Sequence, residues 1–276
     1  MAVSIRKSFA NVFSDSEILS KYTALVILSF CTGLLTFVLL GKNYTWLPIA
    51  TPLYFLAAII AGGYDIKYVK ELINNEDARM PDWSKENLLE FFYIGAKYFI
   101  ATMIFFLIIT PVIFLPIIFI SLLYKTYPYL ILLIIIPILL AIVTALYFFI
   151  CFPGIIYTFI NTDNDLLTFF NVKKICSYFS VNYFTSIFAI VCLNIPVYFM
   201  AQCSTIRLKY ALFYIIPLML APIIRMVFCN LMSQAYISNN KDNDGSIAKM
   251  FGYLFLLIFE IMIFTIAYII FAIKFS

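Results

Sequence analysis

Two ionisable side chains, Arg225 and Glu260, stand inside long apolar runs of this 276-residue sequence. An ionisable group deep in a membrane helix is expensive to insert, so such groups pair with one another or line a polar path. Asn230 and Gln234 add hydrogen-bonding groups to the run that holds Arg225. We therefore predict that Arg225 and Glu260 pair across a helix interface. The pair is either structural or the polar lining of a path for an ion or an anionic substrate.

A second set of polar residues closes the second long apolar run. Lys67 and Glu71 stand four positions apart, as an ion pair on one helix face would, whereas Ile66, Val69 and Ile73 continue an apolar stripe. This helix is therefore predicted to extend a turn or two beyond the membrane surface.

The residues that follow predict a return into the membrane. Asn74-Asn75 ends the helix, Met80-Pro81 favours an extended link, and Asp82 or Ser84 caps the next helix. We name residues 61–83 the elbow. It acts either as a structural anchor or as a docking surface for a protein or for lipid headgroups, and the residues assigned to it are Gly63, Tyr64, Asp65, Lys67, Lys70, Glu76, Asp77, Pro81 and Trp83.

Common catalytic and metal-binding signatures are absent from the sequence. It contains no histidine, which is the commonest metal ligand and general base. Its six cysteines form no CxxC motif, and no nucleophile-elbow, zinc-protease or phosphate-loop motif occurs. We expect a protein that is not an enzyme and has no cofactor and no metal site. No basic tract suggests a nucleic-acid partner.

Composition identifies the solvent as lipid. The chain is 64% hydrophobic and only 12% charged, with a mean hydropathy of +1.03, whereas soluble domains carry about 25% charged residues. Apolar runs such as Ile131–Leu140 do not alternate with polar residues, which argues against a β-barrel. The predicted fold is all-α, a polytopic bundle of transmembrane helices.

The apolar runs predict seven spans. Because only Tyr124–Tyr127 separates the third from the fourth, six spans with a re-entrant hairpin is the alternative. The predicted spans are 21–41, 47–69, 91–123, 128–160, 182–203, 210–236 and 250–273.

The distribution of Lys and Arg predicts orientation, because cytoplasmic loops are enriched in these residues. With the N-terminus in the cytoplasm, five lie outside: Lys42, Lys125, Arg207, Lys209 and Lys274. Twelve lie inside: Arg6, Lys7, Lys21, Lys67, Lys70, Arg79, Lys85, Lys97, Lys173, Lys174, Lys241 and Lys249. We therefore expect a cytoplasmic (inner) membrane protein with a cytoplasmic N-terminus.

Two segments have the pattern of helices lying at the membrane surface. The first is an apolar stripe of Ile5, Phe9, Val12 and Phe13, followed by a capping box at residues 14–17. The second lies near residues 162–179. Because each leads into two spans, the pattern predicts an internal repeat at 2–70 and 164–236.

The elbow also carries a family resemblance. Its pattern G-Y-x-I-[KR]-x-V, a short acidic loop and [LM]-P-x-W resembles domain-of-unknown-function family 4013, an uncharacterised family of bacterial and archaeal multi-pass membrane proteins. The matching residues are Gly63, Tyr64, Ile66, Lys67, Val69, Glu76, Asp77, Met80, Pro81 and Trp83.

Looser similarity extends the resemblance over residues 1–237 and includes Phe9–Asp15, Phe152–Gly154 and Asp165–Tyr183. Residues 238–276 are then a linker and an additional C-terminal helix. Lys67 stands where the family often has arginine, which weakens any bidentate anion contact there. The family has no established activity, so the resemblance implies a class of membrane protein and no reaction.

Two functions follow as expectations. The first is a non-enzymatic structural, accessory or assembly component of a prokaryotic cytoplasmic membrane. Its partners are the lipid bilayer and a protein at residues 61–97. The second is a small transporter or channel that uses proline-broken helices and the Arg225 and Glu260 pair.

Overall fold

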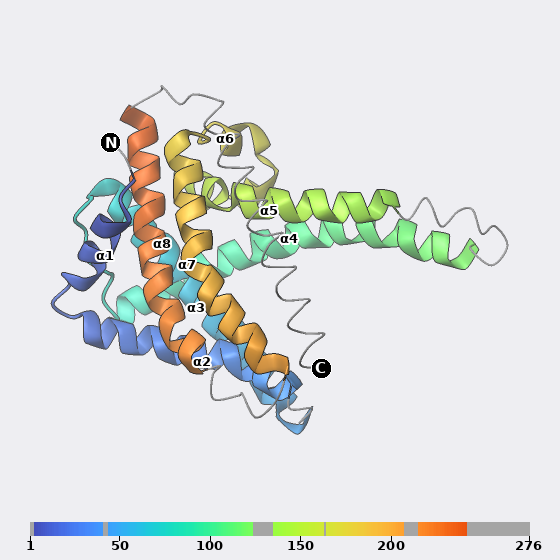
Figure 1. Cartoon of the computed structure of the whole chain (residues 1–276), viewed down its shortest axis with the longest axis horizontal. Coiled ribbons are helices and arrows are strands. Elements are labelled where there is room, and N and C mark those ends of the chain that lie inside the picture. The colour runs from blue at the N-terminus through green and yellow to red at the C-terminus, as the bar shows by residue number, and fades with distance from the viewer. Residues whose placement is uncertain (1–2, 41–43, 124–134, 163, 207–214, 242–276) are drawn as a thin grey trace. The chain divides into compact units, whose positions relative to one another are not determined.

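The computed structural model describes residues 3–40, 44–123, 135–162, 164–206 and 215–241, which form helices joined by short connections (Figure 1). Within these ranges there is no strand, as predicted. The helices are α1 (Ile5–Phe13), α2 (Ile18–Leu40), η1 (Tyr44–Trp46), α3 (Leu47–Asn74), α4 (Lys85–Leu123), α5 (Ile135–Asn161), η3 (Thr168–Phe170), α6 (Val172–Cys176), α7 (Val181–Ile206) and α8 (Ile215–Lys241).

The chain divides into two compact units. The first unit contains residues 1–96 and 178–276, and the second contains residues 97–177. The long helix α4 begins in the first unit and ends in the second. Each unit is described by itself below.

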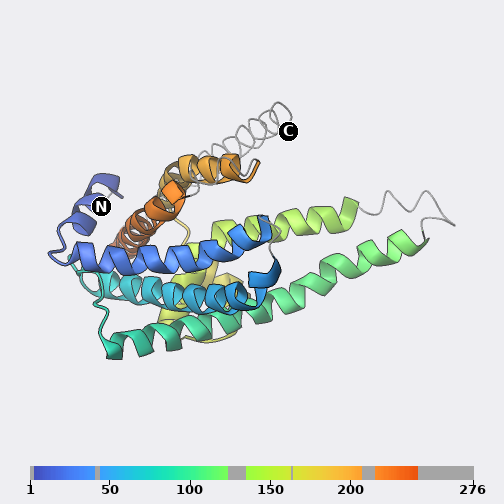
Figure 2. The same cartoon turned by 90° about the horizontal axis from the view of Figure 1, so that it is seen from below.

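In the first unit, α2 packs along α3, and α8 contacts α1, α2, α3 and α7 (Figure 2). Small side chains on α3 make this packing close, since Ala50, Ala57 and Ala61 are all buried. From α8, Val227, Leu231 and Met232 contribute to the buried core. The unit is therefore built around the contact of α3 with α2 and α8.

In the second unit, the remainder of α4 runs antiparallel to α5. Tyr98 packs edge-on against Phe159 with ring centroids 5.4 Å apart, and Phe105 stacks against Tyr147 with centroids 6.1 Å apart. The Tyr147 hydroxyl donates a hydrogen bond of 2.8 Å to the carbonyl of Phe169 in η3. Aromatic packing thus joins α4, α5 and η3.

Four helical segments are long and apolar enough to cross a membrane: Ile18–Thr36, Tyr44–Asn74, Lys85–Pro111 and Ile215–Asn239. They coincide with the predicted first, second, third and sixth spans. Shorter apolar helices, Ile150–Asn161 and Val181–Val197, overlap the predicted fourth and fifth spans. The predicted seventh span, 250–273, lies outside the described residues.

Internal prolines do not end these helices. α3 continues through Pro52, α5 through Pro153, α7 through Pro196 and α8 through Pro222. The proline-broken helices expected from the sequence are therefore continuous at these four positions. A proline removes one hydrogen bond of the helix, and neighbouring helices can compensate for that loss.

The two segments predicted at the membrane surface fold differently from each other. α1 is a regular helix capped by Ser4, but its buried side is Ser8 and Val12, while Ile5 and Phe13 are exposed. The second segment is broken into η3 and α6, because the side chain of Asn171 caps a new helix by accepting from the Lys174 N–H. The apolar stripe predicted for the first segment is thus divided between buried and exposed positions.

Candidate functional site

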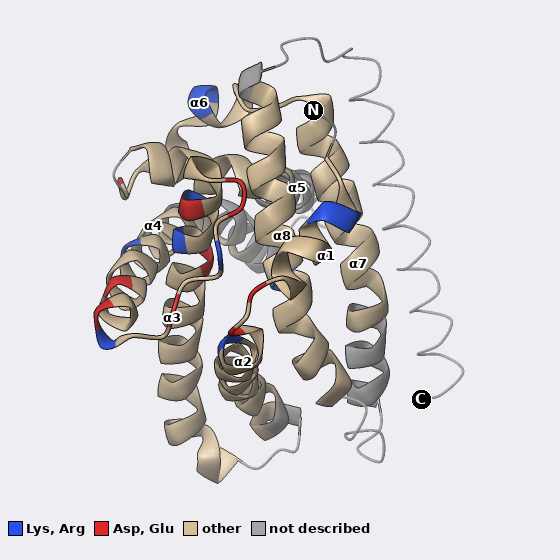
Figure 3. Ribbon diagram, turned by 90° about the vertical axis from the view of Figure 1, so that its left-hand side faces the viewer, with Lys and Arg blue, Asp and Glu red and all other residues tan. Residues whose placement is uncertain are grey.

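The elbow has the backbone course that the sequence predicts. α3 ends at Asn74, an extended link follows, and the Ser84 hydroxyl caps α4 by accepting from the Asn87 N–H at 3.2 Å. Figure 3 shows charged residues gathered where the end of α3, the starts of α2 and α4, and α1 meet. The elbow is therefore the charged end of the first unit.

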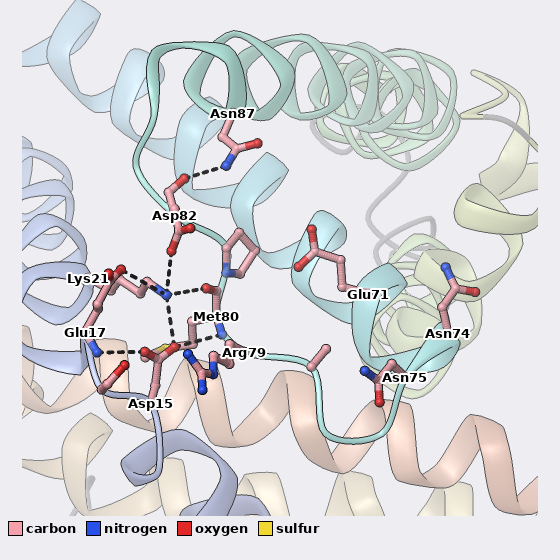
Figure 4. Close-up of a pocket in the computed structure, with 13 residues that line it drawn as sticks. Asp15, Glu17, Lys21, Glu71, Asn74, Asn75, Arg79, Met80, Asp82 and Asn87 are labelled. Carbon is pink, nitrogen blue, oxygen red and sulfur yellow. Dashed lines mark hydrogen bonds and ion pairs between the residues drawn. The ribbon is translucent and has the colours of Figure 1, made fainter.

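A buried lysine joins α2 to the elbow. The Lys21 ammonium donates to the Asp15 carboxylate at 3.0 Å, to the Met80 carbonyl at 2.7 Å, and pairs with Asp82 at 2.7 Å (Figure 4). An ammonium group has three N–H donors, so these contacts occupy all of them. Only 4% of the Lys21 side chain is exposed, which makes this group an internal connection.

Asp15 completes this connection from the turn between α1 and α2. Its carboxylate accepts from the backbone N–H of Glu17 at 2.9 Å and from that of Met80 at 3.1 Å. Burial alone would raise the pKa of Asp15. The hydrogen bonds from Glu17, Lys21 and Met80 together with the Lys21 charge outweigh burial, so the pKa is lowered.

α1 ties the elbow to α8. Lys7 pairs with Glu76 at 2.9 Å, and the Asn11 amide donates to the Glu76 carbonyl and to the Asn230 side chain, each at 3.2 Å. Gln234 accepts from the Ser4 backbone N–H at 2.8 Å. Polar contacts from α1 thus hold the elbow and the C-terminal half of α8 together.

Most residues assigned to the elbow from sequence serve its internal packing. Gly63, Tyr64 and Pro81 are buried, and Tyr64 stacks on Trp83 with centroids 4.9 Å apart. Lys67 turns toward α4, where it bonds Asn87 at 2.7 Å and Glu90 at 2.6 Å; its predicted partner Glu71 lies farther away, at 4.0 Å. Lys70 and Asp77 are the exposed members of the predicted set.

Arg225 pairs with a residue of the elbow. Its guanidinium Nε donates to the carboxylate of Asp65 on α3. Close by on the same two helices, the Asn230 amide donates to the Tyr68 hydroxyl at 2.9 Å. The partner predicted from sequence, Glu260, lies outside the described residues, so its pairing stays a prediction.

Asp15 and Lys21 are the important residues that sequence reasoning missed. Asp15 belonged to a predicted capping box, and Lys21 was used only to predict orientation. One signal was available: a lysine at the start of an apolar run needs a carboxylate if it is buried. The partners of that lysine come from the turn that holds Asp15 and from the distant link that holds Met80 and Asp82, so spacing along the chain does not identify them.

A pocket of about 490 Å³ opens beside the Lys21 contacts. Figure 4 shows Lys21, Asp15 and Glu17 on one side of it, and Glu71 and Asn74 from α3 on the other. Arg79, Asn75, Asp82 and Asn87 also line it. It is polar, carries charges of both signs and lies within the first unit.

No group of three or more His, Cys, Asp or Glu side chains in the described part of the chain is placed to hold a metal ion.

Comparison with known families gives one match. A family model described as "Protein of unknown function (DUF4013)" matches residues 46–206, which is more than half of the chain and includes the elbow. No curated protein and no solved structure matches the chain.

Proposed function

The chain belongs to the DUF4013 family of proteins of unknown function, and from this premise we propose that it is a non-enzymatic, multi-pass component of a prokaryotic cytoplasmic membrane. In this proposal it has a structural, accessory or assembly role and holds a protein partner at residues 61–97. Four helices with the length and apolarity of membrane spans support the location.

One observation supports the proposed role: contacts from Lys7, Asp15 and Lys21 hold the elbow in place, while two of its charged side chains stay exposed. Lys21 and Asp15 bind the backbone of Met80, and Lys7 binds Glu76. Lys70 and Asp77 remain exposed on the same segment. A surface whose shape is set before binding loses less entropy on docking, which suits an assembly component.

The proposed orientation keeps the N-terminus and the elbow in the cytoplasm. The contacts of Lys7 with Glu76 and of Gln234 with Ser4 support one shared side for the N-terminus, the elbow and the end of α8. The larger number of Lys and Arg in these segments favours the cytoplasm.

The proposal also keeps seven spans and two repeats. In support of the repeats, a short helix precedes two long ones twice, as α1, α2, α3 and as α6, α7, α8.

A small transporter or channel is the second candidate. The pair of Asp65 and Arg225 favours it, because both residues lie within candidate membrane spans. The described helices continue through their prolines, so broken helices add no support to this candidate.

The test uses charge reversal at the two exposed elbow positions. Lys70→Glu and Asp77→Lys are compared with Lys173→Glu, a matched change at an exposed residue of α6. Each tagged protein is purified from its native membrane in mild detergent, and co-purifying proteins are quantified by mass spectrometry. A partner retained by wild type and by Lys173→Glu but lost from both elbow variants is the expected result.

A flux measurement distinguishes the two candidates. Liposomes that contain the purified chain should release ions and small anions no faster than protein-free liposomes. Flux that disappears in Arg225→Gln, together with unchanged co-purification in the elbow variants, would replace the accessory role with transport.

A further inference from the structure

We propose that the pocket beside Lys21 binds the headgroup of a membrane lipid that carries a primary ammonium and a phosphate, as phosphatidylethanolamine does. This inference goes beyond the docking role and does not require a protein partner. It uses the pocket-facing residues Glu17, Glu71 and Arg79, whereas the proposed protein contact uses Lys70 and Asp77.

The position of the pocket is that of the headgroup layer. Lys21 lies in the first turn of the candidate span Ile18–Thr36, Glu71 in the last turn of α3, and Asn87 in the first turn of α4. Three spans thus end at the pocket wall, which places it at the level where a bilayer changes from hydrocarbon to polar groups.

The size of the pocket fits an organic group. Its volume of about 490 Å³ is within the range of about 300–1,000 Å³ that small-molecule sites have. A bare metal ion would leave most of this volume empty.

The excess of carboxylates in the pocket lining favours a cationic group of the ligand. Four carboxylates line the pocket, those of Asp15, Glu17, Glu71 and Asp82, against the cations Lys21 and Arg79. Lys21 is already saturated, so it offers no N–H to an anion.

Among the residues that the structure describes, two of these carboxylates have only distant charged partners. Glu17 is 3.7 Å from Lys21, and Glu71 is 4.0 Å from Lys67. Both can accept hydrogen bonds from a primary ammonium. A quaternary choline group has no N–H to donate, and an anionic headgroup would meet an excess of negative charge.

Arg79 can bind the phosphate of the headgroup. Its side chain is exposed on the pocket wall and makes no ion pair within the described part of the chain. A guanidinium binds phosphate oxygens through two parallel N–H donors. The side chain of Asn74, which also lines the pocket, carries an amide that can donate further hydrogen bonds. The pocket therefore presents an anionic and a cationic group, as a zwitterionic headgroup requires.

The experiment measures lipid binding by the purified, delipidated full chain. Soluble short-chain phosphatidylethanolamine, phosphatidylcholine and phosphatidylglycerol are titrated separately, with calorimetry or native mass spectrometry as the readout. The ethanolamine lipid should bind about tenfold more tightly than the other two, because only it donates N–H to the carboxylates. Equal affinity for all three lipids would overturn the proposal.

Variants test which residues bind the ammonium group and which bind the phosphate. Glu71→Gln and Glu17→Gln should each reduce the preference for ethanolamine over choline, and Arg79→Gln should weaken binding of both lipids. Glu17 has a side chain 63% exposed, so its replacement keeps the fold intact even if Glu71→Gln unfolds. Asp77→Asn, an exposed elbow change that does not line the pocket, should bind like wild type.

Two further outcomes are decisive. If Glu17→Gln, Glu71→Gln and Arg79→Gln all bound the lipid as tightly as wild type does, the lipid would not bind in this pocket and the proposal would be overturned. Free phosphoethanolamine should bind more weakly than the lipid. If it bound as tightly, a soluble ligand would replace the lipid as occupant. Because no partner is present, a failure here is separate from a failure of the co-purification test.

Discussion

Gly63 in α3 lies in backbone contact with α4. A Cβ atom added to it would lie 1.7 Å from the carbonyl oxygen of Phe91, and one added to Gly95 would lie 1.9 Å from that of Ile59. The neighbouring Gly62 has nothing within 4 Å of the corresponding position. A pair of glycines in a helix allows either a close helix contact or a bend, and the structure assigns the close contact to Gly63.

Gly63→Ala should therefore destabilise the protein by at least about 1–3 kcal/mol, the usual range for overpacking, because backbone atoms cannot yield as a side chain can. Gly62→Ala is the matched control and should be neutral or stabilising by about 0.5–1 kcal/mol, since alanine favours a helix interior. Chemical unfolding in detergent, followed by circular dichroism, measures both. Equal stability of the two variants would contradict the contact.

Asp15 should make the folding stability of the protein depend on pH in the acidic range. Its pKa lies below the ordinary value of 3.8 when folded, so the folded chain holds fewer protons at this site than the unfolded chain. The stabilisation by the ionised Asp15 carboxylate is therefore fully present above its ordinary pKa, and it is lost as the pH falls through the lower pKa of the folded state.

The unfolding midpoint of Asp15→Asn should accordingly lie below that of wild type by a constant amount between about pH 8 and 5. The difference should shrink below about pH 4, as wild-type Asp15 becomes protonated. Subtracting the variant from wild type removes the titration of other carboxylates. A difference that stays constant down to pH 2 would show that the Asp15 charge does not stabilise the fold.

At the scale of elements, α3 and α8 are joined by polar contacts among apolar side chains. Arg225 bonds Asp65, and Asn230 bonds Tyr68. A polar group within a membrane span needs such a partner, since lipid supplies none. These contacts fix the facing sides of the two helices, which apolar packing alone would specify less well.

A double-mutant cycle tests the ion pair between these helices. Asp65→Asn and Arg225→Gln should each destabilise, and the double variant should be less destabilised than the sum by about 0.5–3 kcal/mol. A second cycle with Glu260→Gln and Arg225→Gln tests the partner predicted from sequence. Coupling in the second cycle alone would contradict the contact with Asp65.

The fold was predictable where lipid imposes a simple rule, and the site was not. Long apolar runs predicted helices because a helix satisfies its own backbone within a bilayer, and four of the described helices are long and apolar enough to cross one. Local chemistry located the end of α3 and limited the cap of α4 to Asp82 or Ser84, of which the structure has Ser84. The partners of Lys21 and Arg225 depend on which helices meet, and Asp65 stands 160 positions before Arg225. No spacing rule joins residues so distant.

At the scale of the whole molecule, side-chain contacts bring segments that are distant in the sequence together within the first unit. Lys7 joins the N-terminal segment to Glu76, Lys21 joins α2 to Asp82, and Gln234 joins α8 to Ser4. A helix pair that leaves this side as α2 and returns as α3 has to bring the N-terminal segment and the elbow together. In the proposed orientation the N-terminal segment and the elbow lie in the cytoplasm, because cytoplasmic loops are enriched in Lys and Arg.

Cysteine labelling in intact cells tests this topology. In a variant without its native cysteines, single cysteines replace Ser14, Asp77 and Ser276, and a membrane-impermeant maleimide is added before and after permeabilisation. With a cytoplasmic N-terminus and seven spans, Ser276→Cys should react in intact cells, whereas Ser14→Cys and Asp77→Cys should react only after permeabilisation. Protection of all three would indicate six spans. Labelling of Asp77→Cys but not Ser14→Cys in intact cells would contradict the contacts that bind the N-terminal segment to the elbow, because Lys7 cannot reach Glu76 across a bilayer about 30 Å thick.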